Sequence, residues 1–257
     1  MTYGFIGAGN MAQSMIKVLL AADIAPTDIM VASPRRASEL AERFKIRAAS
    51  NAELVAASDV IILAFLPNQL ATIAAPIAEQ ATGKTIISVL AGVPLADITA
   101  AFPGAYAVRS LPNINVAQGL GNTSLAFADG IPEQAKQAAQ AFYKTMSATV
   151  VLDEDRFAAF SAVAGSAPAY VCRFIAAISD AGIANGLDAE TTEQIVTQMV
   201  LGSAKTLQES GQTARELAAT VASPGGCTEA GLKKADAIAF DRMISQVIDA
   251  TVHHKHT

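Results

Sequence analysis

The chain has 257 residues, of which 52% are hydrophobic and only 16% are charged, and its formal net charge is -5. A chain of this length buries a large core and more often forms two compact units than one. The acidic balance argues against a nucleic-acid partner, because a phosphate backbone calls for a basic face. Much of the apolar excess is alanine, which we interpret as helices buried against one another, often between subunits.

The sequence also argues against membrane, metal and disulfide chemistry. Its longest uncharged runs, residues 60–78 and 110–128, are interrupted by proline, asparagine and glutamine, so neither resembles a membrane span. The N-terminus goes straight into a β-prone stretch, unlike a signal peptide. Cys172 and Cys227 are too few and too far apart for a disulfide framework or a metal site. We therefore expect a cytoplasmic protein with no bound metal and no membrane partner.

The first motif lies at the start of the chain, where Gly7 to Ala12 read Gly-x-Gly-x-x-Ala. The preceding residues 2–6 are β-prone, and the apolar residues of 11–20 recur at helical spacing, so the order is strand, glycine turn and helix. In this context Gly7 permits the turn, and Gly9 lets the backbone approach a pyrophosphate. The N–H groups at the positive end of the helix would hold the phosphates. The alternative interpretation is a glycine-rich turn without a ligand.

Up to residue 152, short β-rich runs alternate with helical patterns, which is typical of a parallel, doubly wound α/β sheet of the Rossmann type. After the opening strand, we predict strands at 29–32, 60–64, 85–89, 105–109, 123–127 and 149–152. We predict helices near 36–44, 68–80, 94–101 and 132–143. Because such sheets bind ligands at the carboxyl ends of their strands, the polar residues that follow the strands are site candidates.

The second strand is followed by Ser33-Pro34-Arg35-Arg36, where an NAD-dependent protein usually has an acidic residue that bonds the adenosine ribose. A hydroxyl and two guanidinium groups suit a 2′-phosphate, since arginine offers paired donors to phosphate oxygens. The sequence therefore favours NADPH over NADH. The alternative is that Arg35 and Arg36 are solvated charges at a helix start, although there they would oppose the helix dipole.

The β-rich runs then stop, and we predict an all-α second domain over residues 153–257, after a dinucleotide-binding domain over residues 1–152. Its expected helices are 156–186, 189–210, 213–219, 228–234 and 239–252. Residues 157–172 carry no charge and contain Gly165 and Pro168, which indicates a helix that is buried on several faces and kinked or broken near the proline. Such a helix needs a partner, and we expect a second copy of the chain.

The second domain also contains the run Ser-Pro-Gly-Gly-Cys-Thr at residues 223–228. Pro-Gly-Gly forms a turn, and the helix that follows presents its first amides toward that turn. Backbone N–H groups could hold a small carboxylate there, while the Ser223 or Thr228 hydroxyl reaches another atom of the same ligand. The alternative interpretation is a helix cap without a ligand.

Taken together, the motifs resemble those of pyrroline-5-carboxylate reductases over nearly the whole chain. The matching blocks are residues 7–12, Ala32-Ser33-Pro34, Asn51 with Ser58-Asp59-Val60, Arg109-Ser110-Leu111-Pro112-Asn113, Gly165-Ser166-Ala167-Pro168-Ala169-Tyr170 and, most specific of all, Ser223-Pro224-Gly225-Gly226-Cys227-Thr228. The resemblance implies a Rossmann domain followed by a helical dimerisation domain, in a homodimer that often assembles into larger rings such as a decamer. It also implies hydride transfer from a nicotinamide cofactor to 1-pyrroline-5-carboxylate, which gives L-proline in the last step of proline biosynthesis.

The resemblance further implies roles for single residues. Thr228 and Ser223 are expected to contact the substrate as catalytic residues, with a substrate-binding set of Gly225, Gly226 and Cys227 beside them. Together with the residues argued above, the cofactor-binding set is Gly7, Ala8, Gly9, Asn10, Met11, Ser33, Arg35, Arg36, Asn51, Ala64, Leu66, Pro67, Pro112 and Asn113. We expect NADPH as the cofactor, with NAD as the alternative.

Three positions depart from the family pattern. Leu66 stands where the family commonly has lysine, Ala167 replaces a usual glycine, and the chain lacks the family's Gly-Gly-Phe in its final block. The missing lysine implies one cofactor contact fewer. None of the three departures removes a group that the expected chemistry needs.

The expected substrate is an imine, which is basic enough to be protonated before the hydride arrives. A ketone reductase must instead supply a proton to a developing alkoxide. The enzyme can therefore rely on orientation and on one hydroxyl at the nitrogen. The sequence agrees, since its only histidines are His253, His254 and His256, all within the last five residues. We interpret Cys227 as structural rather than reactive.

Two alternatives remain open. A β-hydroxyacid dehydrogenase of the same architecture would need a lysine in the first long helix of the second domain, and residues 156–184 contain none. A protein that binds NADPH without catalysis would leave the run at 223–228 as a helix cap. An assay that follows NADPH oxidation in the presence of pyrroline-5-carboxylate distinguishes the three functions.

Overall fold

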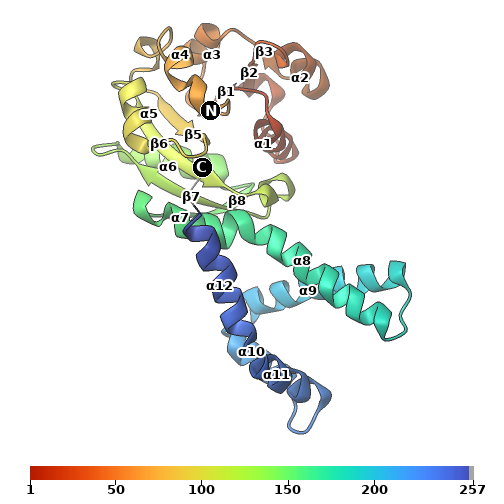
Figure 1. Ribbon diagram of the computed structural model, residues 1–257. Helices are drawn as coiled ribbons and strands as arrows, with labels where there is room; N and C mark the ends of the chain where they lie inside the picture. The colour runs from red at the N-terminus through yellow and green to blue at the C-terminus, as the bar shows by residue number, and fades with distance from the viewer. Residues whose placement is uncertain (255–257) are drawn as a thin grey trace. The chain divides into compact units, whose positions relative to one another are not determined.

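The computed structural model describes residues 1–254 and divides the chain into two compact units, the first ending at Gly165 and the second beginning at Ser166. The first unit holds a β-sheet flanked by helices, and the second holds helices alone (Figure 1). The predicted fold class, a Rossmann-type sheet followed by a helical domain, is therefore confirmed. The boundary predicted after residue 152 stays a prediction. His256 lies outside the described residues.

One eight-stranded sheet forms the centre of the first unit. Its strands are β1 (Tyr3–Ile6), β2 (Ile29–Ala32), β3 (Arg47–Ala48), β4 (Val60–Leu63), β5 (Thr85–Ser88), β6 (Tyr106–Pro112), β7 (Gly121–Phe127) and β8 (Ser147–Val151). Their order is β3-β2-β1-β4-β5-β6-β7-β8, and every neighbouring pair is parallel except β6 and β7. This pair departs from the predicted parallel arrangement, because residues 113–120 are too short a connection for the crossover that parallel strands require.

Helices cover both faces of this sheet. They are α1 (Asn10–Ala21), α2 (Ala37–Phe44), α3 (Asn51–Ala57), α4 (Leu70–Ala74), α5 (Leu95–Ala101) and α6 (Glu133–Tyr143), and the short helix α7 (Phe157–Phe160) follows the last strand. Short 3-10 helices lie at Pro26–Asp28, Pro67–Gln69, Glu79–Ala81, Ile114–Gln118 and Glu154–Arg156, and a π-helix lies at Ser161–Ser166. The helical residues that follow β8 thus begin within the first unit.

Three predictions of local structure need correction. The helix predicted over 68–80 is broken, since Pro76 has no N–H to continue it and α4 ends at Ala74. Periodicity misses β3 and α3, because β3 has two residues and α3 has seven. A local signal for α3 is nevertheless present: Ser50 accepts the Glu53 N–H while the Glu53 carboxylate accepts the Ser50 N–H, which is a capping box.

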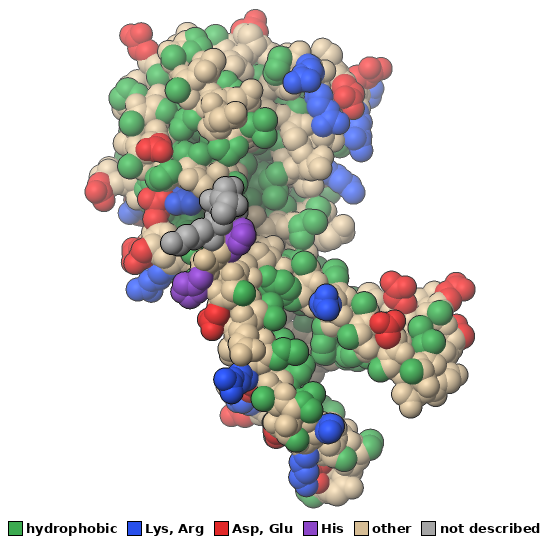
Figure 2. All heavy atoms as spheres, viewed as in Figure 1, with side chains coloured by type: hydrophobic (Ala, Val, Ile, Leu, Met, Phe, Trp, Pro, Cys, Tyr) green, Lys and Arg blue, Asp and Glu red, His purple; other side chains and the backbone are tan. Residues whose placement is uncertain are grey.

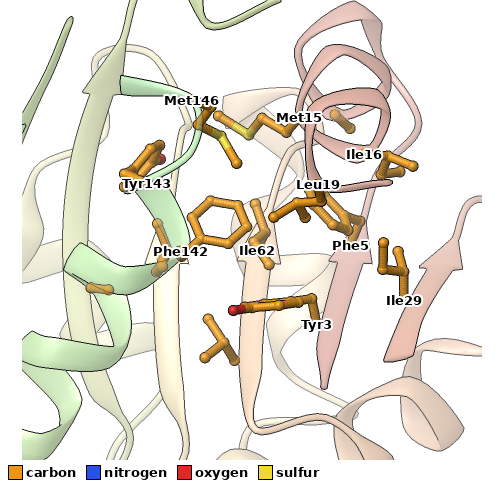
Figure 3. Close-up of a cluster of buried hydrophobic side chains, with 14 of the residues drawn as sticks. Tyr3, Phe5, Met15, Ile16, Leu19, Ile29, Ile62, Phe142, Tyr143 and Met146 are labelled. Atoms are coloured by element: carbon orange, nitrogen blue, oxygen red, sulfur yellow. The ribbon is translucent and has the colours of Figure 1, made fainter. Parts of the chain in front are cut away.

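The core of the first unit consists of two hydrophobic clusters on opposite faces of the sheet. One joins β1, β2 and β4 to α1 and α6, and the other joins alternate residues of these strands to α3, α4 and α5. Phe142 of α6 is fully buried in the first cluster, with its ring centroid 5.5 Å from that of Tyr3 and 6.1 Å from that of Phe5 (Figure 3). These contacts fix the strand that leads into the glycine turn.

A polar contact holds the beginning of β1. The Asp59 carboxylate accepts the backbone N–H of Thr2 at 2.8 Å and the Thr2 hydroxyl at 3.0 Å. The backbone hydrogen bond is the main reason why the pKa of the Asp59 carboxyl lies below its usual range. The ionised carboxylate therefore ties the N-terminus to the loop before β4.

The second unit consists, within its described residues, of α8 (Ala167–Ala184), α9 (Ala189–Ser210), α10 (Ala214–Val221), α11 (Cys227–Ala237) and α12 (Phe240–Val252). α8 packs along α9, and the Tyr170 hydroxyl shares a hydrogen bond with the Thr251 hydroxyl of α12. The long apolar helix is irregular rather than broken, because a π-helix at Ser161–Ser166 joins α7 to α8 without a gap just before Pro168.

Very little apolar surface is buried in the second unit. Val196 is its single buried hydrophobic side chain between residues 166 and 254. Large hydrophobic side chains that are 38% to 62% exposed gather on its helices and on the turns between them (Figure 2), namely Val171, Phe174, Ile183, Leu187, Ile195, Met199, Leu201, Val221, Leu232, Ile238, Met243, Ile244 and Val247. By length and composition alone, Glu154–Ala184 could also cross a membrane. So small a core does not stabilise a unit of this size, so this surface needs a partner.

Candidate active site

A cavity of about 870 Å³ opens where β1, β2, β3 and β4 end. Its lining is Ile6, Gly7, Ala8, Gly9, Ala32, Ser33, Pro34, Arg35, Arg36, Ala49, Ser50, Asn51, Ala64, Phe65, Leu66, Gln69 and Ile73. Nine of the fourteen residues predicted to bind cofactor therefore meet here, although they come from four separate segments. Five predicted residues lie outside this lining, namely Asn10, Met11, Pro67, Pro112 and Asn113.

The two glycines of the opening motif meet different demands. Gly7 has a φ of 113°, and a Cβ added to it would lie 2.2 Å from the Ala64 carbonyl oxygen, so the fold itself requires glycine there. Gly9 has a φ of -72°, and an added Cβ would meet no protein atom closer than the Ala64 oxygen at 3.9 Å. The fold would therefore tolerate a side chain at Gly9. The space next to its Cα, large enough for a methyl group, is open to a ligand.

Helix α1 begins beside this space with its first amides free of side-chain caps. Gly9 is the N-cap, and no side chain bonds the first turn, which also contains no acidic residue. The first N–H groups of a helix have no intrahelical acceptor and carry partial positive charge. The Gln13 side chain donates to the Ala8 carbonyl at 3.1 Å, so it does not occupy these amides. The start of α1 is therefore suited to phosphate.

The residues after β2 bring positive charge to the cavity. Ser33 is half-buried, whereas Arg35 and Arg36 are exposed. Arg36 lies 3.7 Å from the Glu39 carboxylate, with both side chains at least half exposed. An exposed pair of this kind contributes little stability, so a phosphate can replace Glu39 as the partner of Arg36.

Helix α3 contributes a second helix N-terminus to the lining. Asn51 is its first residue, and Ser50 is its N-cap. Asn51 is among the residues predicted to bind cofactor, whereas Ser50 is not, although its Ser-x-x-Glu spacing to Glu53 is a signal for this helix start. The prediction also missed Phe65, Gln69 and Ile73, since a chain pattern alone does not tell which residues of a loop face a cavity.

The loop after β4 forms the opposite wall. The Ala64 N–H donates to the Ile6 carbonyl at 2.8 Å, which fixes this loop against the glycine turn. Leu66 lines the cavity with 67% of its surface exposed, and Pro67 opens the 3-10 helix behind it. An exposed leucine at the rim offers apolar contact but no hydrogen bond.

Asn113 is placed differently from the other predicted cofactor residues. It is 4% exposed, and its amide donates to the Ala164 carbonyl at 2.9 Å and accepts the Asn122 N–H at 3.1 Å. Both ends of the side chain thus have partners within the first unit. Pro112 ends β6 directly before it.

The predicted substrate turn lies between α10 and α11 in the second unit. Gly225 has a φ of 76°, and the Gly226 N–H donates to the Ser223 carbonyl at 2.9 Å, so the run does form a tight turn. Gly226 is the N-cap of α11, and no side chain caps that helix. The amides of Cys227 and Thr228 are therefore the first N–H groups of a helix and have no intrahelical acceptor.

An acidic side chain already occupies one amide of this turn. The Glu229 carboxylate accepts the Gly225 N–H at 2.9 Å and lies 3.0 Å from the Lys233 ammonium. The backbone hydrogen bond, with Lys233 second, holds the pKa of the Glu229 carboxyl below its usual range. The geometry thus leaves the Cys227 and Thr228 amides, rather than that of Gly225, for a bound carboxylate. No cluster that could hold a metal ion is found among residues 1–254.

The chain matches two family models: pyrroline-5-carboxylate reductase dimerisation over residues 154–257, and NADP oxidoreductase, coenzyme F420-dependent, over residues 2–92. A pyrroline-5-carboxylate reductase of Bacillus subtilis is 34% identical over 254 residues, which cover 96% of this chain and 91% of that relative. The chain belongs to the pyrroline-5-carboxylate reductase family. The resemblance inferred from its motifs is therefore confirmed.

Solved pyrroline-5-carboxylate reductases share the fold of the whole chain. The enzyme of Coxiella burnetii is 26% identical, with a TM-score of 0.91 over 98% of this chain and 96% of that one. A pyrroline carboxylate reductase of Plasmodium falciparum with NADP bound is 23% identical, with a TM-score of 0.84 over 98% of this chain and 95% of that one. Both therefore share the arrangement of a β-sheet domain followed by a helical domain with this member of the reductase family.

Proposed function

We propose that this protein reduces 1-pyrroline-5-carboxylate to L-proline, the last step of proline biosynthesis, with NAD(P)H bound in the cavity of the first unit. The observation that carries the proposal is the match to pyrroline-5-carboxylate reductases at 34% identity over 96% of the chain. The glycine turn, the free start of α1 and the cavity at the strand ends support a dinucleotide there. The family model for NADP oxidoreductases covers the same residues.

The reaction needs few groups from the protein. The reduced nicotinamide supplies a hydride, which adds to the C=N carbon of the protonated imine and gives the ring amine of proline. We assign the Thr228 hydroxyl to the imine nitrogen, and the amides of Cys227 and Thr228 with the Ser223 hydroxyl to the substrate carboxylate. Gly225 and Gly226 shape the turn that aims these groups. Orientation then supplies most of the rate, and no further acid is required.

For the cofactor, we propose a preference for NADPH over NADH, set by Ser33, Arg35 and Arg36 after β2. Their position on the cavity lining supports this assignment. Each guanidinium offers paired donors to a phosphate oxygen pair, and the weak Arg36–Glu39 contact leaves Arg36 free to turn. The solved Plasmodium falciparum relative that has NADP bound shares this fold. NADH would lack the 2′-phosphate and these contacts.

For assembly, we propose a homodimer formed by the second unit, further assembly of dimers into rings such as a decamer, and a cytoplasmic location. The match to a dimerisation model over residues 154–257 supports a second copy as the partner. That range includes the apolar segment Glu154–Ala184, so a protein partner rather than a lipid bilayer accounts for its composition. The exposed hydrophobic side chains of α8 to α12 supply the surface that such a partner covers.

The function is tested by mixing the protein, NADPH and pyrroline-5-carboxylate and following the absorbance of the reduced cofactor. Thr228→Ala removes a bond to the reacting nitrogen, so it should lower kcat by about tenfold to a few hundredfold, the effect of one positioned hydrogen bond. Ser223→Ala removes a contact made equally in ground and transition states, so it should mainly raise KM.

The control is NADPH binding, followed by fluorescence, which should be unchanged in both variants. If the wild-type protein binds NADPH but does not oxidise it with pyrroline-5-carboxylate, it is a nucleotide-binding protein without this activity. If it is active and both variants keep wild-type kcat and KM, the turn at 223–228 is a helix cap and the substrate residues lie elsewhere.

A further inference from the structure

Gln13 of α1 bonds both carbonyl groups that flank the Gly9 Cα. Its backbone N–H donates to the Gly9 carbonyl at 3.0 Å, which begins the hydrogen-bond ladder of the helix. Its side-chain NH2 donates to the Ala8 carbonyl at 3.1 Å, although Ala8 precedes the helix and its N-cap. One residue therefore holds two successive peptide groups of the glycine turn.

The surroundings of the Gln13 side chain fix which end of its amide faces the turn. The Arg43 guanidinium of α2 donates to the Gln13 side-chain oxygen at 3.4 Å. A guanidinium only donates and a backbone carbonyl only accepts. The oxygen of the amide must therefore face Arg43, and its NH2 must face Ala8.

The direction of the two carbonyls decides where the neighbouring N–H groups point. The peptide bonds of the described residues are trans, so the carbonyl and the N–H of each planar peptide group point in opposite directions. Because the Ala8 and Gly9 oxygens face Gln13, the N–H groups of Gly9 and Asn10 point away from it. Neither N–H has an acceptor among residues 1–254.

The cavity at the strand ends lies beside these N–H groups. Ala8 and Gly9 line it, whereas Gln13 does not. Since glycine has no side chain, Gly9 presents its backbone to the cavity. Glycine also permits many backbone conformations, so the peptide between Ala8 and Gly9 would rotate more freely without the bond from Gln13. A phosphate at the start of a helix is bound by such N–H groups, and their directions must be fixed.

We propose that Gln13 is a positioning residue for the cofactor: its side chain holds the Ala8 carbonyl so that the Gly9 N–H joins the Asn10 N–H in binding the pyrophosphate. Gln13 lies one residue beyond the glycine motif, which ends at Ala12, so the motif alone does not select it. The proposal rests on the proposed dinucleotide site of the first unit. It involves no residue of the second unit.

Affinity for NADPH, measured by fluorescence titration, tests the proposal. Gln13→Ala should raise the dissociation constant about threefold to tenfold, the effect of one lost neutral hydrogen bond. Gln13→Met should have the same effect, because it keeps the length of the side chain but has no donor. Ser14→Ala is the matched control at the next residue of α1, which is also half-buried and outside the cavity lining, and it should change the constant less than about twofold.

A second ligand separates positioning from a general loosening of the site. Adenosine 2′-monophosphate has the 2′-phosphate but no pyrophosphate, so its dissociation constant, measured by calorimetry, should stay within about twofold in both Gln13 variants. Equal weakening of the two ligands would mean that Gln13 supports the whole site, and the proposal would be wrong. Wild-type affinity for NADPH in both Gln13 variants, or an equal loss in Ser14→Ala, would also overturn it.

The activity assay distinguishes this proposal from the proposed function. If the variants bind as expected but the wild-type protein does not oxidise NADPH with pyrroline-5-carboxylate, the role of Gln13 stands and the activity is refuted. If the wild-type protein is active and the Gln13 variants bind NADPH normally, the activity stands and the role of Gln13 is refuted. A wild-type protein that does not bind NADPH contradicts both.

Discussion

Replacing Gly9 by alanine tests whether the glycine turn binds a ligand or is required only for the fold. The backbone of Gly9 is extended, with a φ of -72° and a ψ of 177°, which alanine adopts without strain. The added methyl would meet no protein atom closer than 3.9 Å. Gly9 is an N-cap, where alanine is somewhat less favourable, but alanine also reduces the entropy of the unfolded chain. These effects oppose each other, so the change in unfolding free energy should stay within about 1 kcal/mol.

The effect on cofactor affinity should be larger. If the pyrophosphate approaches the backbone at Gly9, the methyl displaces it from the first amides of α1. A hydrogen bond to a charged group contributes about 1.5–3 kcal/mol, so losing one of them should weaken NADPH binding by about tenfold to a hundredfold. Fluorescence titration with NADPH measures this change, and thermal unfolding measures stability on the same sample.

Gly7→Ala is the matched control, because the same methyl has the opposite consequence two residues away. Its Cβ would lie 2.2 Å from the Ala64 oxygen at a φ of 113°, so strain and overpacking together should destabilise the fold by about 2–6 kcal/mol. The reasoning is refuted if Gly9→Ala binds NADPH like the wild type, or if Gly7→Ala unfolds at the wild-type temperature.

Four further expectations can be measured directly. Alanine at both Arg35 and Arg36 should raise KM for NADPH at least about tenfold and leave KM for NADH nearly unchanged, and equal changes would defeat the 2′-phosphate assignment. Phe174→Asp, at a side chain that is 44% exposed, should yield a monomer by light scattering, and an intact dimer would exclude this surface from the interface. Because the pKa of Asp59 is lowered on folding, its contribution to stability is present above about pH 4 and is lost as the pH falls through the lower, folded value, so Asp59→Asn should have a flatter acid-unfolding profile. Phe142→Ala should destabilise the protein by about 3–5 kcal/mol in denaturant unfolding, and a loss below about 1 kcal/mol would mean that α6 is not part of the core.

Much of the first unit could be predicted from the sequence, because its strands are buried and bounded by clear breaks. β1, β2, β4 and β5 are buried at every residue, and such short apolar runs are visible without a structure. The two-residue β3 and the seven-residue α3 are too short for periodicity to detect. β7 runs antiparallel to β6 because the connection between the two strands is short. The length of this connection is known only when the exact ends of both strands are known.

The candidate site was predictable only in part, for a related reason. Residues directly after β1 and β2 could be selected because the direction of those strands puts them at one edge of the sheet. Gln69 and Ile73 line the same cavity, but they lie in the short helices that follow Pro67 and carry no chemical signature. Asn113 shows the converse difficulty. Its motif is recognisable, yet its hydrogen bond to Ala164 spans 51 residues of sequence, which no local pattern reveals.

The near absence of a core in the second unit has a consequence for how the protein is made. With Val196 as its one buried hydrophobic side chain, this part of the described chain cannot complete folding in a unimolecular step. With a second copy as the partner, folding ends in a bimolecular reaction, and stability follows mass action. Each tenfold dilution then removes about 1.4 kcal/mol from the assembled state. At low expression, the concentration of assembled enzyme would therefore rise more steeply than the rate of synthesis. Unpaired chains expose the apolar surface and are open to aggregation and proteolysis.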